Sequence, residues 1–171
     1  MNCAIRNKKG YTLVEVLVVI AIIATLAAIA IPSFMGSPFS HMKLKSTSME
    51  IYTSLQLCRS KAIGSTSQYG VRFDLSASPV TYNIVSRPDS SSSWSTEGSF
   101  ATKQIDPAVL VDSITVDAVN YTTGTTGVIR FEATGTSSSA DIKLKNLADL
   151  NDKYSIAVTS STGRVKIKSG W

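Results

Sequence analysis

The chain has few of the side chains that enzyme and metal sites require. It contains two cysteines and one histidine in 171 residues. His41 has no Cys, Asp or Glu close to it in sequence, so no His–Cys set has the spacing of a zinc site. A Ser-His-Asp arrangement would have to use this same histidine, and no Gly-rich loop is followed by the Lys-Ser/Thr of a phosphate-binding loop. The sequence therefore predicts no enzyme, no metal and no cofactor.

Cysteine usage also excludes a disulfide framework. Cys3 lies in the basic segment of residues 1–10, which we expect below to be a leader that is removed. Its removal would leave Cys58 as a lone thiol. Cys58 falls on the apolar face of a predicted helix, so we expect it to be a small buried hydrophobe rather than a redox group.

The net charge of the chain is small once the basic residues 1–10 are set aside. The formal charge is +5, but residues 1–10 carry three of the 17 basic side chains and no acid, which leaves 14 against 12. A polyanion-binding role for the chain as a whole therefore has little support. The tail differs, since residues 141–171 hold six Lys/Arg against three Asp.

What the chain does have is one long apolar run behind a short basic leader. Residues 13–31 are apolar except for Glu15 and Thr25. At about 1.5 Å per residue, they match the ~30 Å hydrocarbon core of a bilayer. The positive leader holds that end in the cytoplasm and sends the rest outward.

The order of these parts is the reverse of a secretory signal. The one small-residue processing site, Gly10, precedes the apolar run, so cleavage there would keep the hydrophobic helix. An ionised group such as Glu15 is costly in lipid and marks a functional position. The alternative is a simple anchor in which Glu15 snorkels to the interface.

Residues 10–17 (GYTLVEVL) and 27–32 (AAIAIP) resemble the class III leader and N-terminal helix of type IV pilins and type II secretion pseudopilins. The resemblance implies that a prepilin peptidase cuts between Gly10 and Tyr11 and methylates the amino group of Tyr11. It implies that Glu15 pairs with the amine of a neighbouring subunit during filament assembly. Most members have Phe where this chain has Tyr11. Pro32 is expected to kink the helix, because proline removes a backbone donor and clashes with the preceding turn.

These signals divide the chain into a leader (1–10), a transmembrane and assembly helix (11–35), a break or linker (36–42) and an exported domain (43–171). The break is predicted from Gly36 and Pro38. Residues 36–42 also look like a cloning junction, and the sequence leaves both interpretations open.

The exported domain begins with a predicted amphipathic helix over residues 43–64. Its apolar stripe follows 4-3-4-3-4 spacing and is expected to pack on the domain's own sheet. The stripe comprises Leu44, Ser48, Ile51, Leu55, Cys58 and Ala62.

The remainder, residues 69–171, reads as short strands separated by turns. A hairpin is expected from residues 69–75 and 80–85. The fold class is therefore α+β, with a long N-terminal helix packed on an antiparallel β-sheet domain as in the pilin fold. Further strands are predicted at residues 100–105, 110–116, 128–131, 142–144, 154–159 and 164–168.

Four local patterns resemble the GspH/FimT group, in order behind the pilin-like leader. They are residues 57–63 (LCRSKAI), 70–73 (GVRF), 131–135 (FEATG) and 162–166 (TGRVK). The resemblance implies a minor pilin or pseudopilin, held in the bacterial inner membrane with its domain in the periplasm before it joins a pilus or pseudopilus. Its implied partners are other pilins, the prepilin peptidase and an inner-membrane assembly platform.

The tail carries the one alternative function. Alternation in the last strand places Arg164, Lys166 and Lys168 on one face, suited to phosphates, and Trp171 is placed to stack on a base. FimT-like minor pilins are associated with DNA binding through a C-terminal Gly-Arg-x-Arg motif. This chain has Lys166 in place of the second arginine, which keeps the charge and loses the bidentate fork. The competing interpretation is a solvated strand face that protects a sheet edge.

Overall fold

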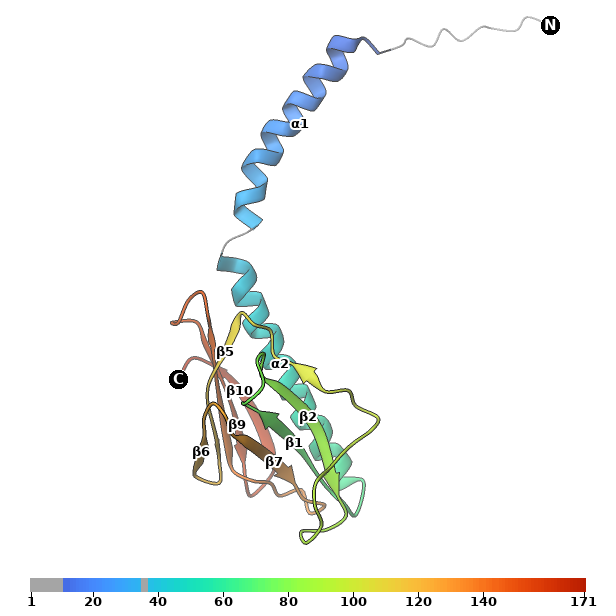
Figure 1. Cartoon of the computed structure of the whole chain (residues 1–171), viewed down its shortest axis with the longest axis vertical. Coiled ribbons are helices and arrows are strands. Elements are labelled where there is room, and N and C mark those ends of the chain that lie inside the picture. Colours follow the sequence, from blue (N-terminus) through green and yellow to red (C-terminus); the bar gives the residue numbers. More distant parts are fainter. Residues whose placement is uncertain (1–10, 35–36) are drawn as a thin grey trace, which may run out of the picture. The chain divides into compact units, whose positions relative to one another are not determined.

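A computed structural model describes residues 11–34 and 37–171. The chain divides into two compact units, residues 1–36 and residues 37–171 (Figure 1). The predicted leader, including Gly10, lies outside the described residues, as do residues 35–36 and the side chains of residues 29–38.

The first unit contains one helix, α1 (Leu13–Phe34). Its start is capped, since the Glu15 backbone N–H donates to Thr12 Oγ1 at 3.2 Å. A Thr followed three residues later by Glu is the sequence of a capping box. The helical backbone runs past Pro32, and the kink predicted there stays a prediction.

Across residues 11–34 and 37–171, we find no helix with both the length and the apolar character needed to cross a membrane.

The second unit begins with α2 (Ser37–Ile63), which corrects the predicted break. Residues 37–42 are helical and continuous with the predicted helix, so α2 starts at Ser37 instead of residue 43. Pro38 falls in the first turn, where a missing N–H breaks no helical hydrogen bond. Contacts remote in sequence also hold this turn, because His41 Nδ1 lies 2.9 Å from Asp152 Oδ2.

Two antiparallel sheets follow. Sheet A has the order β3-β2-β1-β7, with β4 also paired to β2. The predicted hairpin is confirmed, since β1 and β2 pair antiparallel with Val71 opposite Ile84. Its strands are β1 (Gln68–Asp74), β2 (Thr81–Arg87), β3 (Ser95–Thr96), β4 (Lys103–Gln104) and β7 (Thr126–Phe131).

Sheet B has the order β10-β9-β8-β5-β6, so β10 and β6 are its outer strands. Every pairing in it is antiparallel. Its strands are β5 (Val109–Val116), β6 (Val119–Tyr121), β8 (Ala140–Asn146), β9 (Lys153–Thr159) and β10 (Arg164–Ser169).

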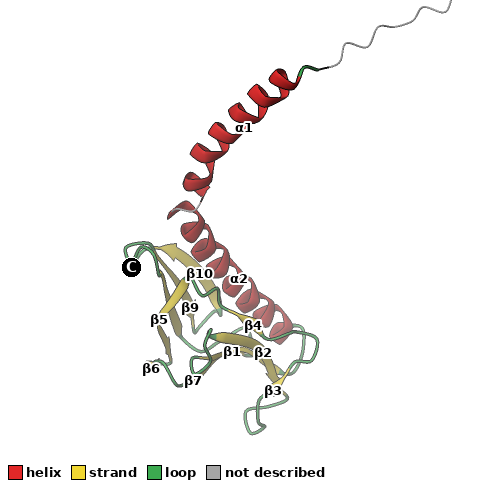
Figure 2. Ribbon diagram, turned by 45° about the horizontal axis from the view of Figure 1, so that its top comes forward, coloured by secondary structure: helices red, strands yellow, loops and turns green. Residues whose placement is uncertain are grey.

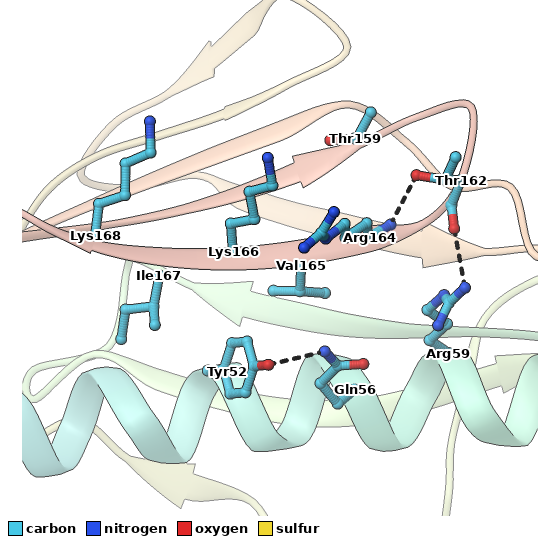
Figure 3. Close-up of a pocket in the computed structure, with 10 residues that line it drawn as sticks. All are labelled: Tyr52, Gln56, Arg59, Thr159, Thr162, Arg164, Val165, Lys166, Ile167 and Lys168. Carbon is cyan, nitrogen blue, oxygen red and sulfur yellow. Dashed lines mark hydrogen bonds between the residues drawn. The ribbon is translucent and has the colours of Figure 1, made fainter.

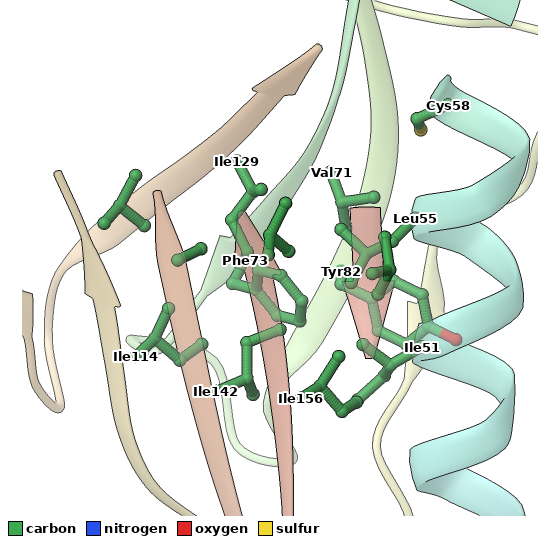
Figure 4. Packing of buried hydrophobic residues seen from close by; sticks show 14 of the residues in the cluster. Ile51, Leu55, Cys58, Val71, Phe73, Tyr82, Ile114, Ile129, Ile142 and Ile156 are labelled. Carbon is green, nitrogen blue, oxygen red and sulfur yellow. The ribbon is translucent and has the colours of Figure 1, made fainter. Parts of the chain in front are cut away.

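The core of the second unit lies where α2 meets both sheets (Figure 2). All six residues of the predicted stripe, from Leu44 to Ala62, are fully buried. Opposite them, Phe73 and Tyr82 stack with ring centroids 5.7 Å apart, and Ile142 and Ile156 close the core from sheet B (Figure 4). Helix α2 therefore joins the two sheets into one body, and the predicted α+β fold class is confirmed.

The strand predictions differ from the structure where the sequence is polar. Residues 100–105 form only the two-residue β4, and the short strands β3 and β6 were not predicted. Val119 and Asn120 of β6 are both exposed. Buried and exposed side chains therefore do not alternate there, and the sequence pattern that predicts a strand is missing.

Candidate assembly site and basic sheet surface

Glu15, the predicted assembly residue, lies in the first turn of α1 with its side chain exposed. A carboxylate at this position is favoured by the helix dipole and by the unpaired N–H groups of the first turn. Sequence reasoning overlooked this local role, although Thr12-x-x-Glu15 is the signal for it. Glu15 shares a shallow surface depression with Tyr11, Val16 and Val19, so the ring of Tyr11 and the carboxylate lie on one side of the helix start.

The three predicted cations of the tail lie on β10 as expected. Arg164, Lys166 and Lys168 are exposed, whereas Val165 is buried and Ile167 half-buried against the core (Figure 3). Within residues 11–34 and 37–171, none of the three cations forms an ion pair with an acid. They are therefore available to an external anion.

The structure adds three lysines to this face that the sequence analysis did not single out. Lys168 of β10 lies opposite Ser155 of β9, which lies opposite Lys143 of β8. Lys153 and Lys145 are directly opposite one another, an arrangement that costs stability when both are charged. The only sequence signal was the net positive charge of residues 141–171.

Trp171 lies among these lysines. Its ring centroid is 5.0 Å from Lys153 Nζ, 5.6 Å from Lys145 Nζ and 5.8 Å from Lys143 Nζ. The negative face of the indole offsets part of their repulsion. Lys143 and Lys145 also pair with Asp141 and Asp112, so the least compensated cations of sheet B are those of β10.

A groove of about 850 Å³ lies between β10 and α2 (Figure 3). Its helical wall is made by Tyr52, Gln56 and Arg59, whose 4-3 spacing places them on one stripe of α2. The Gln56 amide donates to Tyr52 Oη at 3.1 Å. The opposite wall comes from β9 and β10, and none of the described residues that line the groove is acidic. The β-strand and turn residues are Thr159, Thr162, Arg164, Val165, Lys166, Ile167 and Lys168.

Arg59 closes one end of this groove beneath the β9–β10 turn. Its Nη2 donates to the Thr162 carbonyl at 3.1 Å, while its Nε is buried without a hydrogen-bond acceptor. Gly163, in the β9–β10 turn, neighbours Arg59 and has a backbone φ of 60°. A Cβ at this position would lie 2.5 Å from the Gly135 carbonyl oxygen and 3.2 Å from Arg59 Nε, so the turn requires glycine.

Two further titratable side chains, Cys58 and Tyr82, belong to the core. Burial raises the pKa of the Cys58 thiol to about 12, which keeps it protonated and unreactive. Burial also raises the pKa of Tyr82, whose hydroxyl oxygen is buried. In the part of the chain that the structure describes, no three His, Cys, Asp or Glu side chains gather as metal ligands.

The predicted site residues thus form two separate groups. Glu15 and Tyr11 belong to the first unit, and Arg164, Lys166 and Lys168 belong to the second. Gly10 and the side chain of Pro32 lie outside what the structure describes.

Two families match the chain. The family described as Prokaryotic N-terminal methylation motif matches residues 5–31. The family described as Type II transport protein GspH matches residues 47–163. No curated protein matches the sequence significantly.

Solved structures share the fold at low identity. The minor pseudopilin EPSH from the type II secretion system of Vibrio cholerae aligns with a TM-score of 0.60 and 9% identity, over 75% of this chain and 97% of that chain. A second structure of EpsH from Vibrio cholerae gives 0.56 and 11%, over 74% and 97%. The type IV minor pilin FimU of Pseudomonas aeruginosa gives 0.51 and 15%, over 73% and 87%.

At these identities the structural neighbours establish the fold alone. The family match carries further, because it spans more than half of the residues and follows a matched methylation motif in the same chain. The chain therefore belongs to the GspH family of type II transport proteins, within the type IV pilin-like GspH/FimT group.

Proposed function

We propose that this protein is a minor pilin or pseudopilin, a structural subunit and not an enzyme. It assembles from the inner membrane into a type II secretion pseudopilus or a type IV pilus. The observation that carries the proposal is the order of two matches on one chain, an N-terminal methylation motif at residues 5–31 and a GspH domain at residues 47–163.

The proposed mechanism begins with processing by a prepilin peptidase. Cleavage after Gly10 would create an ammonium at Tyr11, four residues before Glu15, and the two residues line one surface depression. A carboxylate moved out of water gains most from an opposite charge, and leaving it unpaired is costly. Pairing Glu15 with the amine of a neighbouring subunit would stabilise the assembled state and set the axial register.

The proposed location follows from the same segment. The apolar residues 13–31 would hold the subunit in the inner membrane, with the domain of residues 37–171 in the periplasm until assembly. Other pilins would surround α1 in the filament, and an inner-membrane platform would supply the force of extraction.

The test replaces Glu15 in the full-length chain. Glu15→Leu is expected to leave membrane insertion unchanged, because it removes the polar group from the apolar run, and to lower incorporation into sheared filaments at least tenfold. Thr25→Leu is the matched control, since it removes the other polar side chain of the run and is expected to assemble normally. Quantitative immunoblots of membrane and filament fractions provide the measurement.

Two results contradict the proposal. One is a Glu15→Leu chain that enters filaments as well as wild type. The other is mass spectrometry of the mature protein that finds residues 1–10 still attached and the amine of Tyr11 unmethylated.

A second candidate function is DNA binding for uptake, favoured by the basic outer face of sheet B. There Arg164, Lys166 and Lys168 lie beside Lys143, Lys145 and Lys153, with Trp171 among the latter three. Phosphates would contact the lysines, and the indole would stack on a base.

Affinity for single-stranded DNA as a function of salt tests this candidate. The Arg164→Ala/Lys166→Ala chain is expected to bind more weakly and to lose about 1.4 units from the slope of log K against log salt, since each phosphate contact with a single strand contributes about 0.7. Lys45→Ala on α2 is the control. The candidate fails if wild type does not bind at low ionic strength or if the double variant binds unchanged.

A further inference from the structure

The outer edge of β10 is open. Strand β10 is the last strand of sheet B and pairs on one side only, with β9. Among the described residues no other strand pairs with it. An open edge presents a row of backbone donors and acceptors to any extended chain that reaches it.

The register identifies the free backbone groups. The Gly170 N–H donates to the Lys153 carbonyl at 2.7 Å, so residue 170 belongs to a hydrogen-bonded pair with β9. Because such pairs alternate along an antiparallel ladder, residues 168, 166 and 164 also direct their backbone groups to β9. Val165 and Ile167 therefore direct their N–H and C=O groups away from β9, toward the open edge.

Charge determines which strand this edge accepts. The outward side chains of β10 are Arg164, Lys166 and Lys168, spaced two residues apart along about 14 Å of strand. A second β10 brought to this edge would oppose cations with cations, which destabilises a strand pair. A strand with carboxylates at alternate positions would instead place each one beside a cation.

The groove provides space on the other face of an added strand. Side chains of such a strand that point away from the cations would enter the 850 Å³ groove toward Tyr52 and Gln56. These groups offer an aromatic surface and a side-chain amide rather than a closed apolar core. The groove is thus suited to short polar or β-branched side chains.

We propose that the open edge of β10 and the adjoining groove bind an extended acidic segment of another filament subunit by strand addition. This inference rests on the proposed function for the source of the segment. The segment spans about six residues, or 20 Å, to match the length of β10. Its backbone pairs with Val165 and Ile167, and its acidic side chains repeat every second residue beside the three cations.

A strand fits this site better than a nucleic acid. The cations repeat at the ~6.8 Å spacing of alternate strand residues, and the open edge supplies donors and acceptors in strand register. A phosphodiester backbone has acceptors only, so it would leave the Val165 and Ile167 carbonyls without a donor.

The experiment uses the full-length chain in detergent and a labelled hexapeptide of alternating Glu and Thr, followed by fluorescence anisotropy. The Glu peptide is expected to bind, and the same peptide with Lys in place of Glu is not. Lys166→Glu is expected to weaken binding of the Glu peptide at least tenfold, because it places a carboxylate beside the carboxylates of the peptide. Lys45→Glu, an exposed site on α2 outside the groove, is expected to bind as wild type does.

Peptide N-methylation separates strand addition from simple charge attraction without altering the protein. Methylation of the amides that face β10 is expected to weaken binding at least tenfold, whereas methylation of the other amides leaves it unchanged. Equal affinity of both methylated peptides overturns the proposal. So does a single-stranded oligonucleotide of equal charge that binds while the Glu peptide does not.

The peptide measurement requires no filament. If the chain assembles through Glu15 but does not bind the Glu peptide, only this inference is contradicted. Failure of the Glu15 test would instead contradict the proposed function and leave the peptide affinity as an independent result.

Discussion

Gly163 is the residue on which the turn before β10 depends. Its φ of 60° is costly for any L side chain, and an added Cβ would also meet the Gly135 carbonyl and Arg59. We expect Gly163→Ala to lower the free energy of unfolding by about 2–4 kcal/mol, measured by urea titration.

Gly170→Ala is the matched control for this substitution. Gly170 has φ of 78° but nothing within 4 Å of an added Cβ, so only the backbone penalty of about 1–2 kcal/mol applies. Equal losses in the two variants would contradict the role of the close approach to Arg59.

Cys58 makes the stability of the protein sensitive to alkaline pH. Its pKa is about 12 in the folded protein against 9.0 for a free thiol. The folded state therefore holds the proton more tightly, and the contribution is complete below pH 9 and is lost as pH rises toward 12. The free energy of unfolding should fall in this window by about 1.4 kcal/mol per pH unit from this thiol alone.

Denaturant titrations at several pH values measure this slope. The Cys58→Ala chain should show a shallower fall, retaining the part due to Tyr82, whose pKa burial also raises. A thiol reagent at neutral pH should label Cys58 only in denaturant, and rapid labelling of the folded chain would show that the thiol is not buried.

At the scale of elements, α2 holds the two sheets together through one stripe. Leu55 lies fully buried in this stripe, so Leu55→Ala should cost about 2–5 kcal/mol of unfolding free energy. Met49→Ala, at a half-exposed position of the same helix, should change it by less than about 1 kcal/mol. Thermal unfolding followed by circular dichroism provides the comparison, and similar losses at both sites would contradict the proposed packing.

Helix α2 shows which features a local sequence pattern can predict and which it cannot. The 4-3 spacing predicted the buried stripe because helical periodicity is a property of adjacent residues. The predicted start of α2 at residue 43 was wrong, because local patterns do not show contacts such as that of His41 with Asp152, 111 residues away. The short strands β3, β4 and β6 depend in the same way on partners rather than on their own residues.

At the scale of the whole molecule, the second unit contains its own core. Every buried hydrophobic residue of the core cluster lies between Leu44 and Val165, so a chain of residues 37–171 should fold and unfold cooperatively. We expect its midpoint of thermal unfolding to match that of the domain in the full chain in detergent, within about 2 °C. A midpoint several degrees lower would show that residues 11–34 contribute to the stability of the domain.

By itself, the sequence determined the features that depend on order along the chain. These are the basic leader before an apolar run with Glu15, the buried stripe of α2 and the alternation of cations along β10. Each can be read from neighbouring residues because helix and strand periodicities are local.

Only the tertiary structure decided which residues from distant strands share a surface. It placed Lys143, Lys145 and Lys153 around Trp171, formed the groove between β10 and Tyr52, and left β10 at an edge of sheet B. Strand order and register arise from pairings between residues far apart in the chain, and no local pattern encodes which strand remains at the edge.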